Sequence, residues 1–482
     1  MTRLFRVIRH EWRLFLSDRT GLLTAILLGI AVSYGVWNGA RWVRFEHRTI
    51  QAALEVEAKT LSTQRRDATA ILEGRAEGGS FTDPTSPGVV GGTFGGGRYA
   101  VLPPGPLAAL SVGQSDLHPS YVRVSLQPIQ NVLSRDEIEN PQTLLLGRFD
   151  FAFVVVYLLP LVIISLSYQL LSGEREEGTL ALLLSQPVAL ATVLSGKVLA
   201  RLLLLLGIVG LVIILASAVG GIDARAQGAM ERLSLITLTI VTYAFLWFGL
   251  AVLVNTLGWS SAANAIVLLA AWLAVVVVIP SSVNVVAGRL YPAPSRVELI
   301  QAMRRATDDA DTHASQLLGK YFQDHPDLVP ASANASMSDF YSRTIAVQSD
   351  AEAAARPVMN RFATQTEAQR RLVDRLQFLS PSVLTRSALD TLAGTSEERY
   401  RDFVRQIEAY HTRWRAFFVP RIMRQAKMTA VDYDQIPVFE YASEAEREVR
   451  ARVWRSIAGL GAPLILVTLA AGFLSGRYRP VG

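Results

Sequence analysis

The chain has 482 residues, of which 50% are hydrophobic and 18% are charged, and its mean hydropathy is +0.29. This balance predicts a polytopic membrane protein with sizeable polar parts. The absence of Cys excludes disulfides and Cys-ligated metal sites. The net charge of +6 comes almost entirely from Arg. In a membrane protein, the more common role of such positive charge is to orient the chain in the bilayer and to contact anionic lipid headgroups. We favour this role over nucleic-acid binding.

The amino terminus predicts a helix on the inner membrane surface, followed by a span. Within residues 1–20, Arg side chains recur at helical spacing and large apolar side chains fill another face. Residues 21–40 are apolar and form the predicted span 1. A signal peptide cleaved near Ala40 is the alternative, but the basic region is too long for one and no small-x-small site follows. We therefore expect an uncleaved first span.

Two long polar regions are predicted outside the membrane. The first, residues 41–148, begins with a helical pattern over Arg41–Glu77 and holds short alternating segments such as Tyr121–Ser125, which suggest a small β or loop element. The second, residues 284–455, is helical by pattern, and its apolar line Phe403–Phe417 is typical of the inside of a helical bundle. We expect a first domain of mixed helix and short strands and an extended helical second domain.

Five further apolar runs complete the membrane part. The predicted boundaries are 149–171 (span 2), 198–220 (span 3), 233–257 (span 4), 262–283 (span 5) and 456–475 (span 6), before a tail at 476–482. The fold class is thus an all-α polytopic membrane protein with six transmembrane helices and two extracytoplasmic domains. Pro160 should kink span 2. The central stretches hold almost no ionisable residues, which argues against an ion-coupled carrier. Asn255 and Asn264, at the ends of spans 4 and 5, are interpreted as satisfying backbone groups only.

Residues 172–197 connect spans 2 and 3 and begin with a charged cluster. Three carboxylates and an Arg precede a Gly and then an almost wholly apolar turn, with Thr179 placed to cap it. Such an arrangement is typical of a segment that docks into a partner, although an ordinary interfacial turn with solvated charges is the simpler alternative. The residues of this cluster and turn are Glu174, Arg175, Glu176, Glu177, Gly178, Thr179, Leu180, Leu182, Leu183 and Leu184.

Positive charge near the span ends predicts the topology. Six spans place both ends of the chain on one side, together with the N-terminal Arg residues, Arg175, Lys197, Arg201 and the Arg477/Arg479 tail. By the positive-inside rule this side is the cytoplasm. The connector is then cytoplasmic, and both long polar regions are outside.

Several kinds of chemistry have no sequence support. Lys197 and Lys320 each follow Gly, but neither pair ends in Ser or Thr, so no Walker A motif is present. The six His residues are scattered without metal-ligand spacing, and no Gly-x-Ser-x-Gly elbow occurs. We expect a non-enzymatic chain without a cofactor or metal of its own, whose energy is supplied by another protein chain.

The connector also resembles that of ABC type-2 transporter permeases, in which a Glu-Arg-Glu-x-Gly-Thr-Leu run precedes the coupling helix. The run Leu144–Val188 is similar to the second span and coupling region of a bacterial subgroup with a large second extracytoplasmic domain, and Leu102–Ser125 and Leu372–Leu389 are similar to it as well. That subgroup is often labelled as multicopper-enzyme maturation permease, but the chain has no copper-ligand cluster of His, Met or Cys.

The resemblance implies a permease subunit in the bacterial inner membrane, with both termini in the cytoplasm. Its implied partners are a cytoplasmic P-loop ATPase, which holds ATP and Mg, and a second permease subunit, the same or related, together with membrane lipids. The ten connector residues are then ATPase-coupling contacts. The implied function is export of a lipid-like or peptide-like amphipathic substrate. The alternative is mechanotransmission, in which ATP-driven motion acts on a periplasmic partner and no solute crosses. A polar cavity between spans 2 and 5 favours the exporter, whereas a sealed span dimer with long rigid arms favours mechanotransmission.

Overall fold

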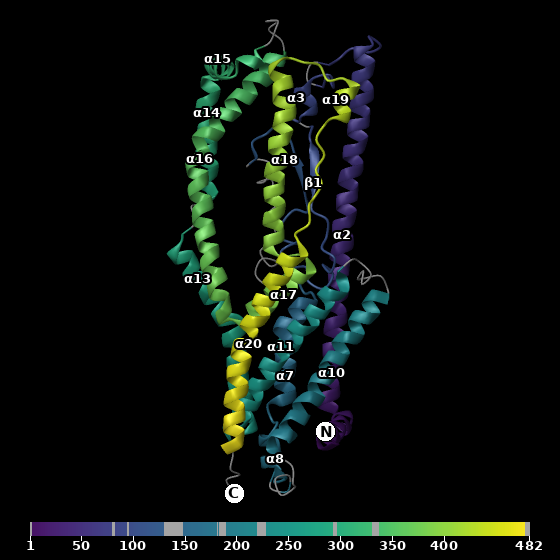
Figure 1. Cartoon of the computed structure of the whole chain (residues 1–482), viewed down its shortest axis with the longest axis vertical. Helices are drawn as coiled ribbons and strands as arrows, with labels where there is room; N and C mark the ends of the chain where they lie inside the picture. Colours follow the sequence, from purple (N-terminus) through teal and green to yellow (C-terminus); the bar gives the residue numbers. More distant parts are fainter. Residues whose placement is uncertain are drawn as a thin grey trace.

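One continuous helix joins the two ends of this elongated molecule. In the computed structural model, which describes residues 2–79, 82–93, 96–129, 148–180, 182, 189–218, 228–292, 296–329 and 337–477, α2 (Arg19–Leu72) has 54 residues. At 1.5 Å per residue it is roughly 80 Å long. The Asp18 side chain starts it by accepting hydrogen bonds from the Thr20 and Gly21 amides. α2 runs from the end that holds both termini to the opposite end (Figure 1), so span 1 and the predicted helix over Arg41–Glu77 are one element.

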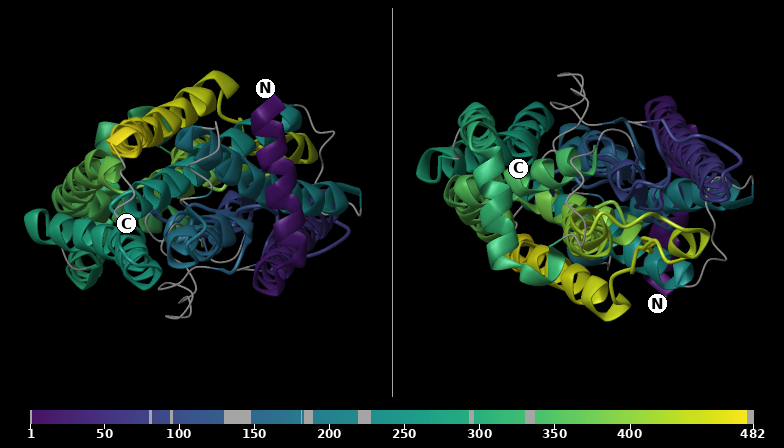
Figure 2. Two further views of the ribbon diagram at one scale, coloured as in Figure 1. Left: turned by 90° about the horizontal axis from the view of Figure 1, so that it is seen from below. Right: turned by 90° about the horizontal axis from the view of Figure 1, so that it is seen from above.

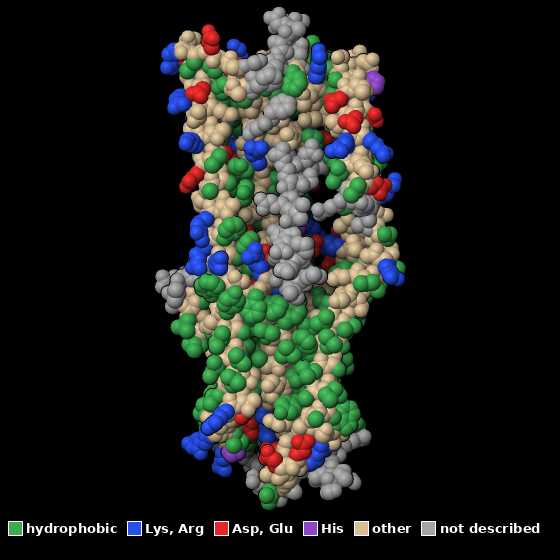
Figure 3. Space-filling model, turned by 180° about the vertical axis from the view of Figure 1, so that it is seen from behind, with side chains coloured by type: hydrophobic (Ala, Val, Ile, Leu, Met, Phe, Trp, Pro, Cys, Tyr) green, Lys and Arg blue, Asp and Glu red, His purple; other side chains and the backbone are tan. Residues whose placement is uncertain are grey.

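The chain is a multi-pass membrane protein with six helical segments that are long and apolar enough to span a bilayer among its described residues. They coincide with the six predicted spans and mostly extend beyond them: Arg19–Leu72, Phe151–Glu176, Leu190–Ser217, Ala229–Asn255, Ser261–Leu290 and Glu446–Gly476. On the face seen in Figure 3, a band of hydrophobic side chains covers this part, with charged side chains below and above it.

The membrane part is built from short and long helices in chain order. These are α6 (Phe151–Phe153), η1 (Val154–Leu158), α7 (Leu159–Ser167), α8 (Ser172–Glu176), α10 (Leu190–Ala218), α11 (Ala229–Asn255), α12 (Ser261–Leu273), η2 (Ala274–Val278), α13 (Ile279–Leu290) and α20 (Glu446–Arg477). α11 packs against α7, α17 and α20, and its Tyr243, Trp247 and Phe248 are fully buried in the core. α10 begins at Leu190, so the last part of the predicted connector, 172–197, belongs to span 3.

The amino-terminal helix lies across the end of the bundle. α1 (Thr2–Ser17) is seen side-on when the molecule is viewed along its long axis from that end (Figure 2, left). Its Trp12 and Phe5 are exposed. This is the arrangement expected of the interfacial helix predicted for residues 1–20.

Spans 2 and 5 each contain a π turn just before a proline. η1 precedes Pro160 and η2 precedes Pro280, the second residue of α7 and of α13 respectively. A proline has no amide hydrogen, so each π turn leaves a carbonyl that needs another donor. A π turn thus lies next to Pro160, where a kink was predicted, and a second one lies next to Pro280 in span 5.

The two polar regions pack together around one shared core. Strands β1 (Arg98–Val101) and β2 (Tyr121–Val124) pair antiparallel, with Ala100 opposite Val122, which confirms the strand predicted at Tyr121–Ser125. The other elements are α3 (Pro87–Val90), α14 (Arg296–Thr312), α15 (Ala314–Asp324), η3 (Pro326–Leu328), α16 (Met337–Leu376), η4 (Gln377–Leu379), α17 (Pro381–Ala393), α18 (Glu397–Met423) and α19 (Ala430–Asp434).

The line Phe403–Phe417 on α18 is the centre of this shared core. Phe403, Tyr410 and Trp414 are fully buried and contact apolar residues of both polar regions. The Trp414 indole donates to the Gly91 carbonyl at 3.0 Å across 323 residues of sequence. The bundle-interior interpretation of this line is correct for these side chains, whereas Phe417 is half-buried.

Candidate functional site

The connector begins with α8, which ends in a Schellman motif. Gly178 has φ +74°, a left-handed conformation that Gly adopts without strain. The Thr179 amide donates to the Glu174 carbonyl at 2.9 Å, and the Gly178 amide donates to the Arg175 carbonyl at 3.1 Å. The Thr179 hydroxyl donates to the Glu174 carboxylate. The Glu-Arg-Glu-Glu-Gly-Thr run therefore contains the end of a helix together with the residues that terminate it.

Arg175 and Glu176 bind the turn between α11 and α12. The Arg175 guanidinium donates to the carbonyls of Gly258 and Trp259, both at 2.6 Å. The Glu176 carboxylate accepts from the Ser261 amide at 2.8 Å and from its hydroxyl at 2.9 Å. Since Ser261 is the first residue of α12, Glu176 caps the start of span 5 from another element. The connector is thus joined to spans 4 and 5.

A buried amide and hydroxyl cluster lies behind this contact. Asn255 accepts from the Leu171 amide at 3.1 Å and donates to the Ser167 carbonyl at 3.1 Å, where the end of α7 leaves backbone groups unpaired. Asn264 donates to the Asn255 side chain at 3.3 Å and to the Ser172 hydroxyl at 3.2 Å. The interpretation that these amides satisfy backbone groups is correct but incomplete, because they also join spans 4 and 5 to the connector.

Glu174 belongs to a charged chain that reaches span 3 and α1. Lys197 on α10 donates to the Glu174 carboxylate at 2.9 Å and lies 3.9 Å from that of Glu11 on α1. Arg201 lies 3.6 Å from Glu11. Glu11 and Lys197 are buried. Removing one member of a buried ion pair strongly destabilises the folded protein, because the other charge is left without a partner. The connector is therefore held from two sides.

The predicted contact residues divide into internal and exposed ones. Glu174, Arg175 and Glu176 are used for bonds within the chain, as described above. Leu180 is buried against Leu171 and Leu194. Glu177 and Gly178 are exposed, and the Leu182 side chain is 70% exposed. Leu183 and Leu184 lie outside the described residues. Glu177 and Leu182 are thus the side chains among the described connector residues best placed to meet another protein.

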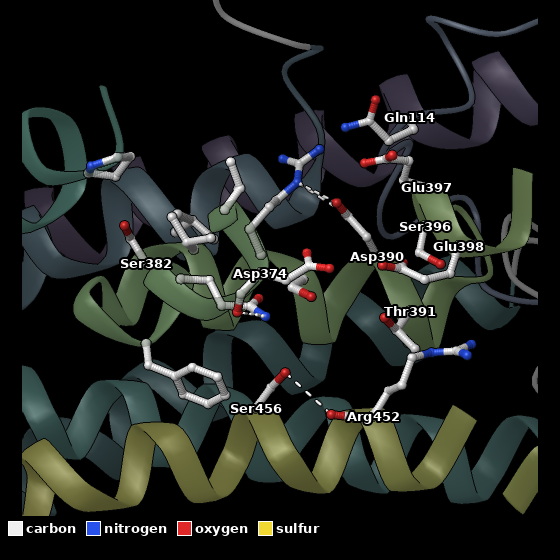
Figure 4. Close-up of a pocket in the computed structure, with 18 of the residues that line it drawn as sticks. Gln114, Asp374, Ser382, Asp390, Thr391, Ser396, Glu397, Glu398, Arg452 and Ser456 are labelled. Atoms are coloured by element: carbon white, nitrogen blue, oxygen red, sulfur yellow. Dashed lines mark hydrogen bonds and ion pairs between the residues drawn. The ribbon is translucent and has the colours of Figure 1, made fainter. Parts of the chain in front are cut away.

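A cavity of about 570 Å³ lies at the opposite end of the spans, where they meet the polar part. We call it the junction cavity. Its apolar wall comes from spans 2 and 5 and from the segment leading into α17: Val156, Tyr157, Val276, Pro280, Phe378 and Val383. Its charged wall comes from α16, α17, α18 and α20: Arg370, Asp374, Arg386, Asp390, Glu397, Glu398, Arg452 and Arg455. Figure 4 shows the carboxylates of α17 and α18 facing it, with Arg452 reaching up from α20.

Arg386 is the central cation of the junction cavity. Its guanidinium lies 3.0 Å from the Asp390 carboxylate and 3.5 Å from that of Asp150, which is fully buried. The Ser111 hydroxyl also donates to Asp390. Burial raises the pKa of Asp390, although Arg386 and Ser111 act in the opposite direction. Burial acts to lower the pKa of Arg386, but the two carboxylates outweigh it and raise that pKa. Arg386 therefore stays charged and connects α17 to the start of span 2.

The carbonyls released by the two π turns are satisfied by other elements. In span 2, the Tyr243 hydroxyl on α11 donates to the Val156 carbonyl at 3.0 Å. In span 5, the Ser380 and Ser382 hydroxyls donate to the Val275 carbonyl at 2.8 and 3.2 Å. α17 packs against both η1 and η2. The irregular turns of both spans thus meet at α17, at the edge of the junction cavity.

Sequence reasoning assigned no function to most of these residues. Lys197 and Arg201 were interpreted as topology signals, and Leu372–Leu389, which contains Asp374 and Arg386, as a subgroup signature without chemistry. One available signal was the pair of amides at span ends, because polar side chains at membrane depth usually find a specific partner.

Within the part of the chain that the structure describes, no group of three or more His, Asp or Glu residues could hold a metal.

Comparison with known proteins gives one match. No curated protein and no solved structure matches the chain. Residues 296–442 match the family described as "Domain of unknown function (DUF3526)". This segment contains α14 to α19, and so contributes Arg386, Asp390 and most of the other charged residues of the junction cavity.

Proposed function

We propose that this chain is the permease subunit of an ATP-driven exporter of the ABC type-2 kind. It would lie in the bacterial inner membrane with both termini and the connector in the cytoplasm. The observation that carries the proposal is the connector: a short charged helix tied by hydrogen bonds and ion pairs to spans 2, 3, 4 and 5, beside an exposed Leu182. A segment joined to four spans can pass a displacement to all of them.

In this proposal the partner ATPase holds ATP and Mg and contacts the exposed part of the connector. Leu182 supplies an apolar knob and Glu177 a carboxylate for a cation on the partner. Arg175 and Glu176 act within the permease, since they convert movement of α8 into movement of the α11–α12 turn. The resemblance to ABC type-2 permeases in Glu174–Leu180 supports the same assignment.

The junction cavity supports an amphipathic substrate. Its apolar wall is formed by spans 2 and 5, and its opposite wall carries both carboxylates and guanidinium groups. A molecule with a hydrocarbon part and a charged headgroup would match both walls. A polar cavity at the ends of spans 2 and 5, where they meet the polar part, favours export over a sealed device.

Leu182→Asp should uncouple the ATPase. A charge at the centre of an apolar contact costs binding energy on the scale of a hot spot, so we expect stimulated ATP turnover to fall about tenfold or more. Thermal stability should not change, because the side chain is 70% exposed. The measurement is ATP turnover of the complex purified gently from native membranes, with mass spectrometry of the co-purified chains.

The matched control for Leu182→Asp is Val431→Asp at the far end of the molecule. Val431 is 64% exposed on α19, and its substitution should leave ATP turnover unchanged. Wild-type turnover in Leu182→Asp, or absence of a P-loop ATPase from the purified complex, would remove the basis for the coupling function.

Mechanotransmission is the second candidate, and the continuity of α2 favours it. This helix runs unbroken from the membrane into the core shared by the two polar regions, so movement of span 1 would reach a periplasmic partner directly. In this case the junction cavity carries no substrate, and α17 serves as a mechanical contact between spans 2 and 5.

Ser387→Trp should distinguish the two candidates. Ser387 lines the junction cavity and is half-exposed, so an indole there fills space without removing a charge. An exporter should lose substrate-stimulated ATP turnover while its partner ATPase still binds. A mechanotransmission device should keep its partner-stimulated turnover. The measurement is ATP turnover with and without total membrane lipid extract.

A further inference from the structure

A second cavity, of about 380 Å³, lies at the connector end of the spans. It is enclosed by α1, the start of α2, α7, α8 and α10, and we call it the α1 pocket. Its size is within the range of roughly 300–1,000 Å³ usual for ligand sites. Its lining includes Glu174, Glu177 and Lys197, but the proposed coupling and export assign no role to the cavity itself.

The lining of the α1 pocket changes in polarity along its helices. Glu11, Lys197 and Arg201 supply charged groups. Phe15 follows Glu11 by one helical turn, Leu204 follows Arg201 by one turn, and with Leu166 they supply the apolar part of the lining. Because α1 lies across the bundle end (Figure 2), this change in polarity falls where headgroups give way to acyl chains in a bilayer.

Arg201 has an unused donor in this pocket. One guanidinium nitrogen, Nη2, lies 3.6 Å from the Glu11 carboxylate. The other, Nη1, is buried and has no acceptor among the described residues. A buried charged donor without an acceptor is costly, and an oxygen of a ligand would satisfy it. A phosphate suits a guanidinium best, because several oxygens match its donor geometry.

The charge balance of the pocket excludes a simple anion. Four carboxylates line it, those of Glu11, Asp18, Glu174 and Glu177, against the two cations Lys197 and Arg201. A ligand with a phosphate alone would add to this negative excess. A ligand that also carries an ammonium group would offset it, and a primary ammonium can donate hydrogen bonds to the carboxylates.

We propose that the α1 pocket binds a zwitterionic phospholipid with a primary ammonium headgroup, such as phosphatidylethanolamine, from the leaflet at the connector end. Its phosphate binds Arg201, its ammonium group faces the carboxylates, and the start of its acyl chains lies against Phe15, Leu166 and Leu204. Glu174 and Glu177 of the connector border the pocket, so the lipid contacts the connector. This lipid binding is independent of the proposed transport function.

The test uses the full chain in nanodiscs of phosphatidylcholine that contain phosphatidylethanolamine with a photoreactive group on one acyl chain. Arg201→Gln should lower the crosslinking yield by about tenfold, the effect typical of a lost charge-assisted hydrogen bond. Arg13→Gln is the matched control: it removes the same charge from exposed α1 surface outside the pocket, and its yield should stay within about twofold. Thr24→Phe fills the pocket, leaves every charge in place, and should lower the yield as much as Arg201→Gln. It therefore keeps the test valid if Arg201→Gln folds poorly.

Competition identifies the ligand class. Unlabelled phosphatidylethanolamine should displace the probe, whereas phosphatidylglycerol, which lacks the ammonium group, and inorganic phosphate should not. Equal loss in Arg201→Gln and Arg13→Gln, or an unchanged yield in Thr24→Phe, overturns the proposal. Displacement by phosphatidylglycerol overturns the zwitterionic assignment, and displacement by inorganic phosphate shows an anion site rather than a lipid site.

Discussion

Arg386→Met should destabilise the protein by about 3–5 kcal/mol, the cost of breaking a buried ion pair by removing one partner. The substitution preserves most of the side-chain volume but leaves the Asp150 and Asp390 carboxylates without their shared cation. Both carboxylates lie where α17 meets the start of span 2, so the contact between the membrane and polar parts should weaken. The measurement is the free energy of unfolding by denaturant in detergent.

The defect of Arg386→Met should shrink at acidic pH. Burial raises the pKa of Asp390 above its ordinary value, and Arg386 opposes this shift, so removing Arg386 should raise that pKa further. A carboxyl whose pKa is raised by folding stabilises the fold while it is protonated, and this stabilisation is lost as pH rises through the folded-state pKa. The difference from wild type should therefore shrink as the pH falls toward the ordinary pKa of an Asp side chain, about 4.

Arg65→Met is the matched control for this prediction. Arg65 pairs with Asp434 at 2.8 Å, and the two side chains are 48% and 61% exposed. Its loss should cost about 0–1 kcal/mol. Equal stabilities of Arg386→Met and Arg65→Met, or a defect independent of pH, would show that the buried carboxylates do not depend on Arg386.

Asn255→Ala should destabilise the protein by about 2–3 kcal/mol and loosen the connector. The Asn255 side chain is almost fully buried and bonds the Leu171 amide and the Ser167 carbonyl. Water cannot replace these bonds easily at this depth. Amide hydrogen exchange in α8 should accelerate by more than exchange in α18, which lies in the separate core of the polar part.

Asn38→Ala provides the control for an amide in a span. The Asn38 amide nitrogen donates a hydrogen bond to the Phe149 carbonyl at 2.9 Å, and the loss of this bond should cost about 1 kcal/mol or less. Uniform acceleration of exchange over α8 and α18 in Asn255→Ala would indicate global destabilisation and contradict a specific role in holding the connector.

Local sequence patterns predicted the elements of the fold well. The six spans follow from runs of about 20 apolar residues, and the helix over Arg41–Glu77 and the strand at Tyr121–Ser125 follow from their periodicity. The stop after α8 was not predicted, although Gly178 carries a local signal for it, because few residues other than Gly adopt a left-handed conformation without strain. Each of these signals lies within one short stretch of chain.

The roles of the connector charges could not be predicted in this way. Glu176 bonds Ser261 across 85 residues and Arg175 bonds Gly258 across 83. Nothing in the run Glu174–Glu177 distinguishes a carboxylate that caps another helix from one that faces a partner. Both Glu176 and Glu177 are exposed, and only the packing of spans 2, 4 and 5 brings the Glu176 carboxylate to Ser261.

The sequence by itself determined that this is an all-α, multi-pass membrane protein with a charged connector between spans 2 and 3. The tertiary structure alone decided that both polar regions share one core around Trp414, that spans 2 and 5 meet α17 at their π turns, and that Arg386 lies between Asp150 and Asp390. The physical reason is range. Hydropathy reports whether a segment lies in lipid or in water, and periodicity reports its local backbone conformation, so both can be read within one segment. These contacts, in contrast, join residues that are far apart in the chain and come together only when the helices pack.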